Sequence, residues 1–185
     1  MHPDSPPCCR FLFALRPPGI LARRVVAFAA RLAEGIPVIP ADRLHLTLAI
    51  SQDFRDYPHA YVETLLRVGG RVAAPPLRVG LDRLVCGSRS VLLLPAVGQR
   101  ELRGLHRGIA EGMAAARAPL REGTSFSPHM TLFYREGGSP ERRIRRIEWR
   151  ADEFVLIRSL VGRSRHEVLR RWPLQAPEPA QYALF

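Results

Sequence analysis

Two short, similar segments of the chain carry the residue types that acid–base chemistry requires. They are His45-Leu46-Thr47-Leu48 and His129-Met130-Thr131-Leu132. One His-x-Thr-Leu segment arises easily by chance, but two of them in matching surroundings form a specific signal. Histidine exchanges a proton near neutral pH, and a threonine hydroxyl can donate a hydrogen bond to a phosphate oxygen. The pair therefore predicts chemistry at an anionic, phosphate-like group.

Strand geometry would put each histidine beside its threonine. Side chains alternate along a strand, so His45 and Thr47 would share one face, as would His129 and Thr131. If the two strands are related by an approximate two-fold axis, both pairs converge on one point. Such a point suits in-line displacement at phosphorus, because one imidazole takes the proton of water while the other protonates the departing ribose oxygen. The scheme requires no metal or other cofactor.

Three other interpretations of these histidines are open. Each His-x-Thr could be a structural hydrogen-bonded pair. His45 and His129 could bind zinc together with His106 or His166, although no His-x₃-His, His-Glu-x-x-His or Cys-x-x-Cys spacing supports this. Ser127 and His129 could form a nucleophile pair, but nothing else in the chain suggests a triad.

The elements that would position the two motifs follow the same order twice. The first round is a strand at Phe11–Leu15, a helix at Ile20–Glu34, a proline-containing loop and a strand at Arg43–Ile50; the second is Val91–Leu94, Arg100–Arg117, Pro119–Pro128 and His129–Tyr134. A repeat of this size indicates a duplicated unit. We also expect a helix at Tyr57–Val68 closed by Gly69-Gly70, a strand over 77–81, and closing strands at Glu153–Leu160 and His166–Pro173.

This order predicts an α+β fold. It would consist of two pseudo-symmetric lobes, each with an antiparallel sheet and outer helices, separated by a cleft. We expect a disordered extension over 1–9, one bilobal domain over 10–174 and an irregular tail over 175–185. The three cysteines are too few and too irregularly placed for a disulfide framework. No apolar run approaches a membrane span and no signal peptide is evident, so we expect a cytoplasmic monomer.

The charge balance favours anionic partners. The net charge is +11, and all 28 basic residues are arginine. A basic surface concentrates polyanions such as RNA, although an arginine bias also reflects a GC-rich genome. The densest group, which we call the arginine cluster, consists of Arg142, Arg143, Arg145, Arg146 and Arg150. It is either a solvated face or an RNA contact.

At its motifs the sequence resembles the two-histidine phosphoesterase superfamily, and within it the bacterial RNA 2′,3′-cyclic phosphodiesterases, also called the 2′-5′ RNA ligase family. The resemblance covers about residues 10–174 and includes Arg10–Leu15, Leu44–Leu48, Ser127–Leu132, Phe154–Ser159 and Trp172-Pro173-Leu174. It implies hydrolysis of a 2′,3′-cyclic phosphate at an RNA 3′ end or nucleotide to a 2′-phosphate. It also implies that His45 is the proton donor and His129 the acceptor, with Thr47 and Thr131 binding phosphate.

The chain departs from the family pattern at positions that bear on the substrate. Ile50-Ser51-Gln52 stands where Phe-Leu-Gly is frequent, Tyr134 and then Arg135 stand where one arginine is common, and His166 stands where tyrosine is common. Phe13, Tyr134 and Arg135 are further candidates for base or phosphate contact, although Phe13 also fits a buried core. Alternatives that keep the site are 2′-5′ RNA ligation and hydrolysis of a small cyclic phosphate. An RNA-binding protein with vestigial histidines is an alternative of another class.

Overall fold

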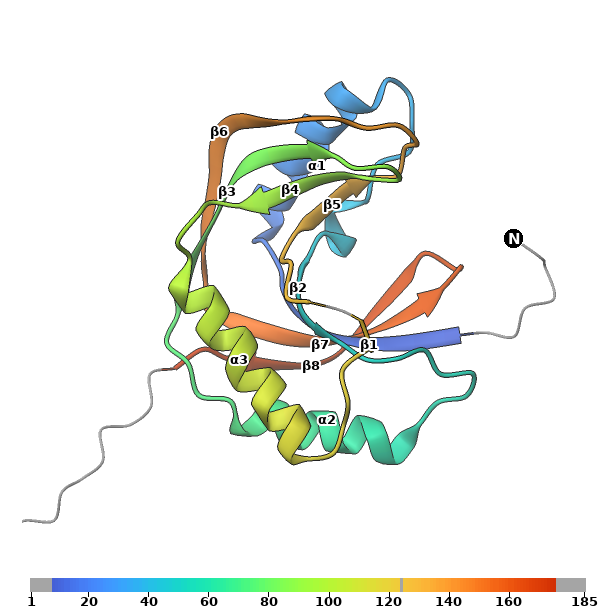
Figure 1. Cartoon of the computed structure of the whole chain (residues 1–185), viewed down its shortest axis with the longest axis vertical. Helices are drawn as coiled ribbons and strands as arrows, with labels where there is room; N and C mark the ends of the chain where they lie inside the picture. Colours follow the sequence, from blue (N-terminus) through green and yellow to red (C-terminus); the bar gives the residue numbers. More distant parts are fainter. Residues whose placement is uncertain (1–7, 124, 176–185) are drawn as a thin grey trace, which may run out of the picture.

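The structure is a computed structural model that describes residues 8–123 and 125–175. Its strands form two four-stranded antiparallel sheets, drawn in Figure 1. The first sheet has the order β2-β1-β7-β8, with bounds Leu46–Ile50, Cys8–Leu15, Glu153–Val161 and Arg165–Pro173. The second has the order β5-β4-β3-β6, with bounds Met130–Phe133, Val91–Pro95, Leu77–Cys86 and Ser139–Ala151. The predicted bilobal α+β class is confirmed.

The helices that connect the motif strands cover the opposite lobe. Helix α1 (Gly19–Ala33) joins β1 to β2 of the first sheet, yet it contacts β5 of the second. Helix α3 (Arg100–Ala115) joins β4 to β5 of the second sheet and contacts β3 of that sheet, but it also contacts β2 and helix α2 (His59–Arg71) of the other lobe (Figure 1). Each helix buries an apolar stripe at helical spacing, such as Leu102, Leu105, Ile109 and Met113 on α3. The two lobes therefore exchange their crossover helices.

One continuous apolar core joins both lobes. Phe11 and Leu46 from the first sheet belong to the same buried cluster as Leu81 and Leu93 from the second. No helix within the described parts of the chain is both long and apolar enough to span a bilayer.

Helix α2 packs closely on β8, and this explains a difference from the predicted helix. A Cβ at Gly69 would lie 2.5 Å from ring atoms of Trp172, so only glycine permits this approach. Gly69-Gly70 therefore lies inside α2, which continues to Arg71, and does not close the helix as the sequence suggested.

A smaller buried cluster lies on the helix-free face of the first sheet. Leu12 and Ala14 of β1 and Val155 and Ile157 of β7 form it. Ile50 on one edge strand and Val168 on the other both pack against it. Ile50 is paired with Leu12 and Val168 with Ile157, so both edge strands extend this apolar face of the sheet.

The structure corrects the predicted N-terminal boundary. Strand β1 begins at Cys8, so Cys8 and Cys9, expected in a disordered extension, are strand residues. Backbone hydrogen bonds in both directions pair Cys9 with Phe54. Residues 1–7 of the predicted extension and 176–185 of the predicted tail lie outside the described residues, and Gln175 forms a bridge with Ala74. The thiols of Cys9 and Cys86 are free.

Strand β6 (Ser139–Ala151) was not predicted from the sequence. This strand carries the arginine cluster and pairs along β3. Its partly or fully buried residues include Ile144, Ile147, Trp149 and Ala151, and the step from 144 to 147 breaks the alternation typical of a strand. The register shift opposite Leu81 and Arg83 accommodates that step.

Candidate active site

The two motifs lie on edge strands, one in each sheet. A 3₁₀ helix, η1 (Ala41–Arg43), leads into His45, which directly precedes β2; His129 directly precedes β5. Leu46 and Leu48 are buried, while His45 and Thr47 are partly exposed. The second motif repeats the pattern, with Met130 and Leu132 buried and His129 and Thr131 partly exposed. The predicted alternation of both motifs is confirmed.

Each motif strand is bound by the loop that precedes the other motif. The backbone N–H of Ile39, ahead of the first motif, donates to the carbonyl of Leu132 at 2.7 Å. The N–H of Arg121, ahead of the second motif, donates to the carbonyl of Ile50 at 2.9 Å. These reciprocal bonds tie the two motifs together, although they belong to different sheets.

The same local hydrogen bond orients both motif histidines. Nδ1 of His45 lies 2.7 Å from the carbonyl oxygen of Arg43, and Nδ1 of His129 lies 2.8 Å from that of Ser127. A carbonyl only accepts, so each Nδ1 carries the proton and donates it. In both rings Nε2 is then the nitrogen left to exchange a proton with a ligand. Ser127 contributes its main-chain oxygen, which differs from the hydroxyl role of a nucleophile pair.

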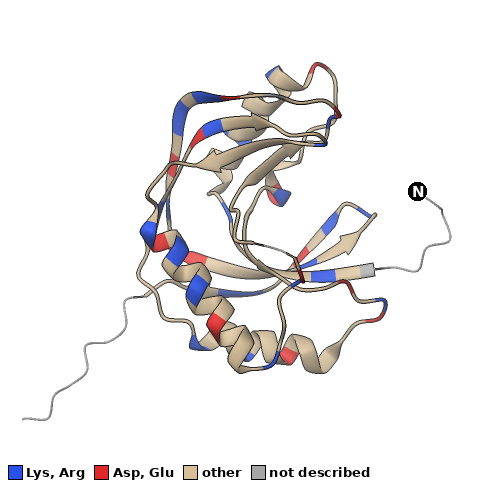
Figure 2. Cartoon of the chain, in the orientation of Figure 1, with Lys and Arg blue, Asp and Glu red and all other residues tan. Residues whose placement is uncertain are grey.

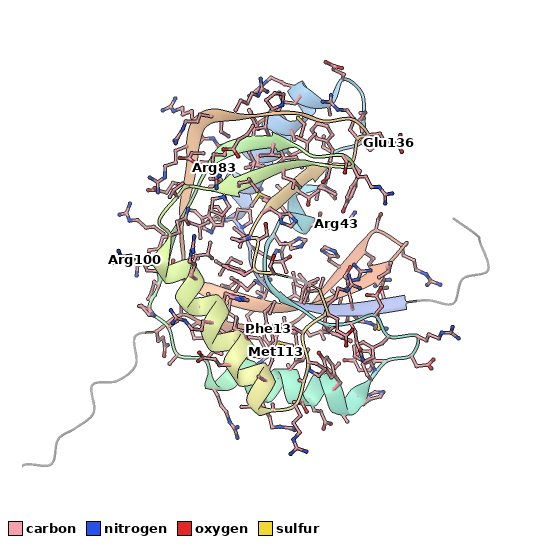
Figure 3. The ribbon with its side chains drawn as sticks, viewed as in Figure 1. Phe13, Arg43, Arg83, Arg100, Met113 and Glu136 are labelled. Carbon is pink, nitrogen blue, oxygen red and sulfur yellow. The ribbon has the colours of Figure 1, made fainter. Side chains whose placement is uncertain are left out.

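Burial and positive charge act on His45. Burial lowers the pKa of His45 most, and the charges of His129, Arg16 and Arg43 lower it further, while the hydrogen bond to the Arg43 carbonyl raises it. The influence of His129 indicates that the two motif histidines lie near each other. Figure 3 shows Arg43 in the region between the two sheets. No hydrogen bond among the described residues engages the Thr47 or Thr131 hydroxyl, so both can bind a ligand.

His166 and His106, which the sequence suggested as possible zinc ligands, contact the motifs. The ring of His166 lies 5.1 Å from that of His45. His106, on α3, donates from Nδ1 to the carbonyl of Leu48 at 2.7 Å and stacks on Phe126 at 3.9 Å. Both contacts depend on tertiary packing, which no local pattern signals. Within residues 8–123 and 125–175, no group of three His, Cys, Asp or Glu side chains is arranged to hold a metal ion.

The structure separates the three weaker candidates. Phe13 is 1% exposed and packs on Phe154 and Trp172, so it belongs to the core and not to a ligand surface. Arg135 lines a groove beside the end of α1, with its guanidinium 3.9 Å from the Cys86 sulfur; neither motif lines that groove. Tyr134 is 64% exposed just beyond β5 and stays a prediction for substrate contact.

The arginine cluster lies at the far edge of the second sheet from Thr131. Strands β6 and β5 are its two outer strands, about 14 Å apart by ordinary strand spacing. Basic residues follow β6 in Figure 2 with acidic residues close by. Arg143 pairs with Asp82, Arg146 with Glu148 and Arg150 with Asp152. Internal ion pairs thus engage part of the cluster, and RNA contact there stays a prediction.

Comparison with known proteins places this geometry in a family. The model of the 2′-5′ RNA ligase superfamily matches residues 17–163. The chain belongs to this superfamily. Its members are two-histidine phosphoesterases, so the chain is an enzyme of the class that acts on phosphodiesters or cyclic phosphates. A search of curated proteins found no match.

Solved structures agree with the superfamily assignment. The structure of E. coli LigT complexed with 3′-AMP is 25% identical, with a TM-score of 0.76, and the match covers 90% of this chain and 98% of that one. A structure described as a phosphoesterase is 26% identical, with a TM-score of 0.72 and coverages of 92% and 99%. TT0787 of Thermus thermophilus, at 24% identity, has a TM-score of 0.70 over 90% and 98% of the two chains.

Proposed function

We propose that this superfamily member hydrolyses a 2′,3′-cyclic phosphate at an RNA 3′ end or on a nucleotide, leaving a 2′-phosphate. The observation that carries the proposal is the matched pair of imidazoles. Each is held at Nδ1 by the carbonyl two residues earlier, which leaves Nε2 to exchange a proton, and each is followed two residues later by a partly exposed threonine. The pair supplies one proton acceptor and one proton donor for a single phosphorus atom.

In the proposed reaction a water oxygen attacks phosphorus and the P–O3′ bond breaks. Nε2 of His129 takes the proton of the water, and protonated His45 gives its proton to O3′. Thr47 and Thr131 donate hydrogen bonds to the non-bridging oxygens, where charge accumulates. The direction of proton transfer follows the family resemblance. The lowered pKa of His45 makes its protonated form a stronger acid than an ordinary imidazolium and leaves a smaller fraction of it protonated at neutral pH. No metal or other cofactor takes part.

Two observations support a nucleotide or RNA substrate. The net charge of +11 favours a polyanion. Crystal structures of E. coli LigT contain that protein in complex with 3′-AMP, ATP, NADP+ and phosphate. The superfamily name also favours a second candidate, 2′-5′ ligation, in which the oxygen of a 5′-hydroxyl end replaces water as the nucleophile, the same P–O3′ bond breaks and a 2′-5′ linkage forms.

The product identifies the reaction. We expect a labelled oligonucleotide with a 2′,3′-cyclic phosphate to be converted to the 2′-phosphate, with equal rates in the presence and absence of a strong chelator. ³¹P NMR of the matching mononucleotide reports which oxygen keeps the phosphate. A 3′-phosphate product would mean that O2′ and not O3′ is the leaving group. Loss of activity in the presence of the chelator would contradict the metal-free mechanism.

Parallel substrates separate the alternatives. Faster turnover of the oligonucleotide than of mononucleotides favours an RNA end, and the opposite order favours a small cyclic phosphate. Added 5′-hydroxyl RNA reveals ligation as a longer product. An RNA-binding protein with vestigial histidines would show no turnover, and its RNA affinity would survive the combined His45→Ala and His129→Ala change.

His106 should affect turnover without touching the substrate, since it links β2 to the loop before His129. We expect His106→Ala to lower kcat about tenfold with little change in KM, because displacing one imidazole by a fraction of an ångström is enough to slow the reaction. His106→Phe tests which contact matters, since it keeps a ring against Phe126 but lacks the donor to Leu48. Steady-state kinetics on a cyclic nucleotide measure both variants, and wild-type kcat in His106→Ala would contradict the coupling.

A further inference from the structure

The two motif histidines are not packed equally. Each has one hydrogen bond, which fixes the Nδ1 end of the ring but permits rocking about it. His45 also has an aromatic neighbour, because the ring of His166 meets it edge to face at an interplanar angle of 69°. Among the described residues no aromatic ring packs on His129 in this way. The pseudo-symmetric site is therefore asymmetric at its two proton-transfer groups.

The contact between His45 and His166 depends on the curl of the first sheet. His45 leads into β2 and His166 lies on β8, and these are the outer strands of the sheet. In a flat sheet they would be about 14 Å apart across the strands. They would also be offset along the strands, because His166 is level with Arg10 while His45 lies beyond the Leu15–Leu46 pair. The ring distance of 5.1 Å therefore requires the first sheet to curl over its helix-free face, which brings His166 to His45. His166 pairs with Ser159 in the β7–β8 ladder, so its backbone is held by the sheet.

His166 itself is an uncharged ring at neutral pH. Its Nδ1 is buried and has no hydrogen-bond partner in the described part of the chain. Burial, followed by the positive charges of His45, Arg43 and Arg16, lowers the pKa of His166 to about 4, against a smaller raising effect of Asp42. Burying a nitrogen without a hydrogen-bond partner costs free energy of folding, and burying a charged imidazolium would cost more than burying the neutral ring. The ring is thus retained at an energetic cost.

We propose that His166 is a positioning residue for His45, whose uncharged ring fixes the orientation of the His45 imidazole and shields it from water. This inference rests on the proposed function, in which His45 is the proton donor. The ionisable groups that face His45 are Arg16 on the segment after β1, Arg43 on η1, His129 before β5 and His166 on β8. Burial holds His166 uncharged, so it desolvates His45 without adding a positive charge beside those of Arg16 and Arg43.

Removing the ring should have two linked effects. In His166→Ala, water reaches His45, and the largest cause of its lowered pKa weakens, so the pKa of His45 rises toward the ordinary value. The limb of the pH–rate profile that belongs to His45 moves to higher pH with it. We expect kcat to fall about tenfold while KM stays within about twofold, because the ring orients a proton donor and does not bind substrate.

The experiment compares His166→Ala with His166→Phe, which keeps a ring of similar size without nitrogen. NMR titration of the His45 ring proton in the protein without substrate gives its pKa, and kinetics on a 2′,3′-cyclic nucleotide give kcat, KM and the pH profile. We expect His166→Phe to keep both the His45 titration and kcat near wild type. His59→Ala, a change at an exposed histidine of α2, serves as the control. If His166→Ala does not fold, His166→Leu takes its place.

An unchanged His45 titration and an unchanged kcat in the variant without the ring would overturn the proposal. Equal losses in the alanine and phenylalanine variants would also overturn it, because the nitrogen and not the ring would then matter. The titration needs no turnover, so a wild-type protein inactive on cyclic phosphates would defeat the proposed function while the contact between His166 and His45 is still tested.

Discussion

His45→Ala and His129→Ala should each lower kcat/KM for a 2′,3′-cyclic phosphate by about 10²–10⁴, the usual contribution of one acid–base group. This corresponds to about 3–5 kcal/mol of activation free energy. In the proposed mechanism each ring presents Nε2 to the same phosphorus atom, and neither can replace the other because one must accept a proton while the other donates. The double variant should lose little more than the worse single variant, because the two groups act as a unit. Initial rates across pH 5–9 measure all three.

Matched variants separate lost chemistry from lost structure. His45→Asn and His129→Asn keep a side-chain amide that can donate to the carbonyl of Arg43 or Ser127, so the loop stays in place while the proton-transfer nitrogen is gone. They should be as inactive as the alanine variants. His59→Ala should behave as wild type. Wild-type turnover in either single alanine variant would rule out the two-histidine mechanism.

Phe13→Ala should lower the free energy of unfolding by about 3–5 kcal/mol, the cost of removing a large aromatic side chain from a packed core. Phe13 is 1% exposed and packs on Phe154 and Trp172 at ring-centre distances of 6.1 and 5.9 Å. Figure 3 places it near Met113 of α3, on the helix-covered side of the sheet. Urea unfolding followed by circular dichroism measures the change.

Phe13→Leu distinguishes a core role from the substrate contact that the sequence also allowed. Leucine keeps most of the apolar volume, so we expect a loss of about 1–2 kcal/mol in stability and a KM equal to that of the wild type. A KM raised severalfold in a well-folded Phe13→Leu protein would return Phe13 to the substrate site. A loss in Phe13→Ala well below that of Phe13→Leu would contradict its place in the core.

Much of the fold followed from local pattern. The alternation at Leu46, Thr47 and Leu48 predicted the buried and exposed sides of β2, and the apolar stripe of α3 predicted its buried face. Strand β6 was not predicted, because its apolar residues are unevenly spaced and its exposed side is rich in arginine. The start of β1 at Cys8 was not predicted, because the residues that pair with this part of the strand, Phe54 and Val161, are remote in sequence.

The parts of the site that escaped prediction are those built by tertiary structure. His106 contacts Leu48 only because α3 covers the other lobe, and His166 contacts His45 only because the first sheet curls. Neither arrangement leaves a periodic signal. Arg135 was uncertain for a related reason, since strand alternation shows that neighbours diverge but not which of them turns toward the motifs.

Because α1 and α3 each pack against the other lobe, neither lobe should unfold independently. The second sheet, 77–151, is contiguous in the chain, but its covering helix α1 is supplied by residues 19–33. Neither half would bury its apolar surface alone, so the polypeptide should melt in one cooperative step and refold slowly through many long-range contacts. A chain cut in the turn at Gly87-Ser88 should yield two pieces that are each unfolded and regain structure only when mixed.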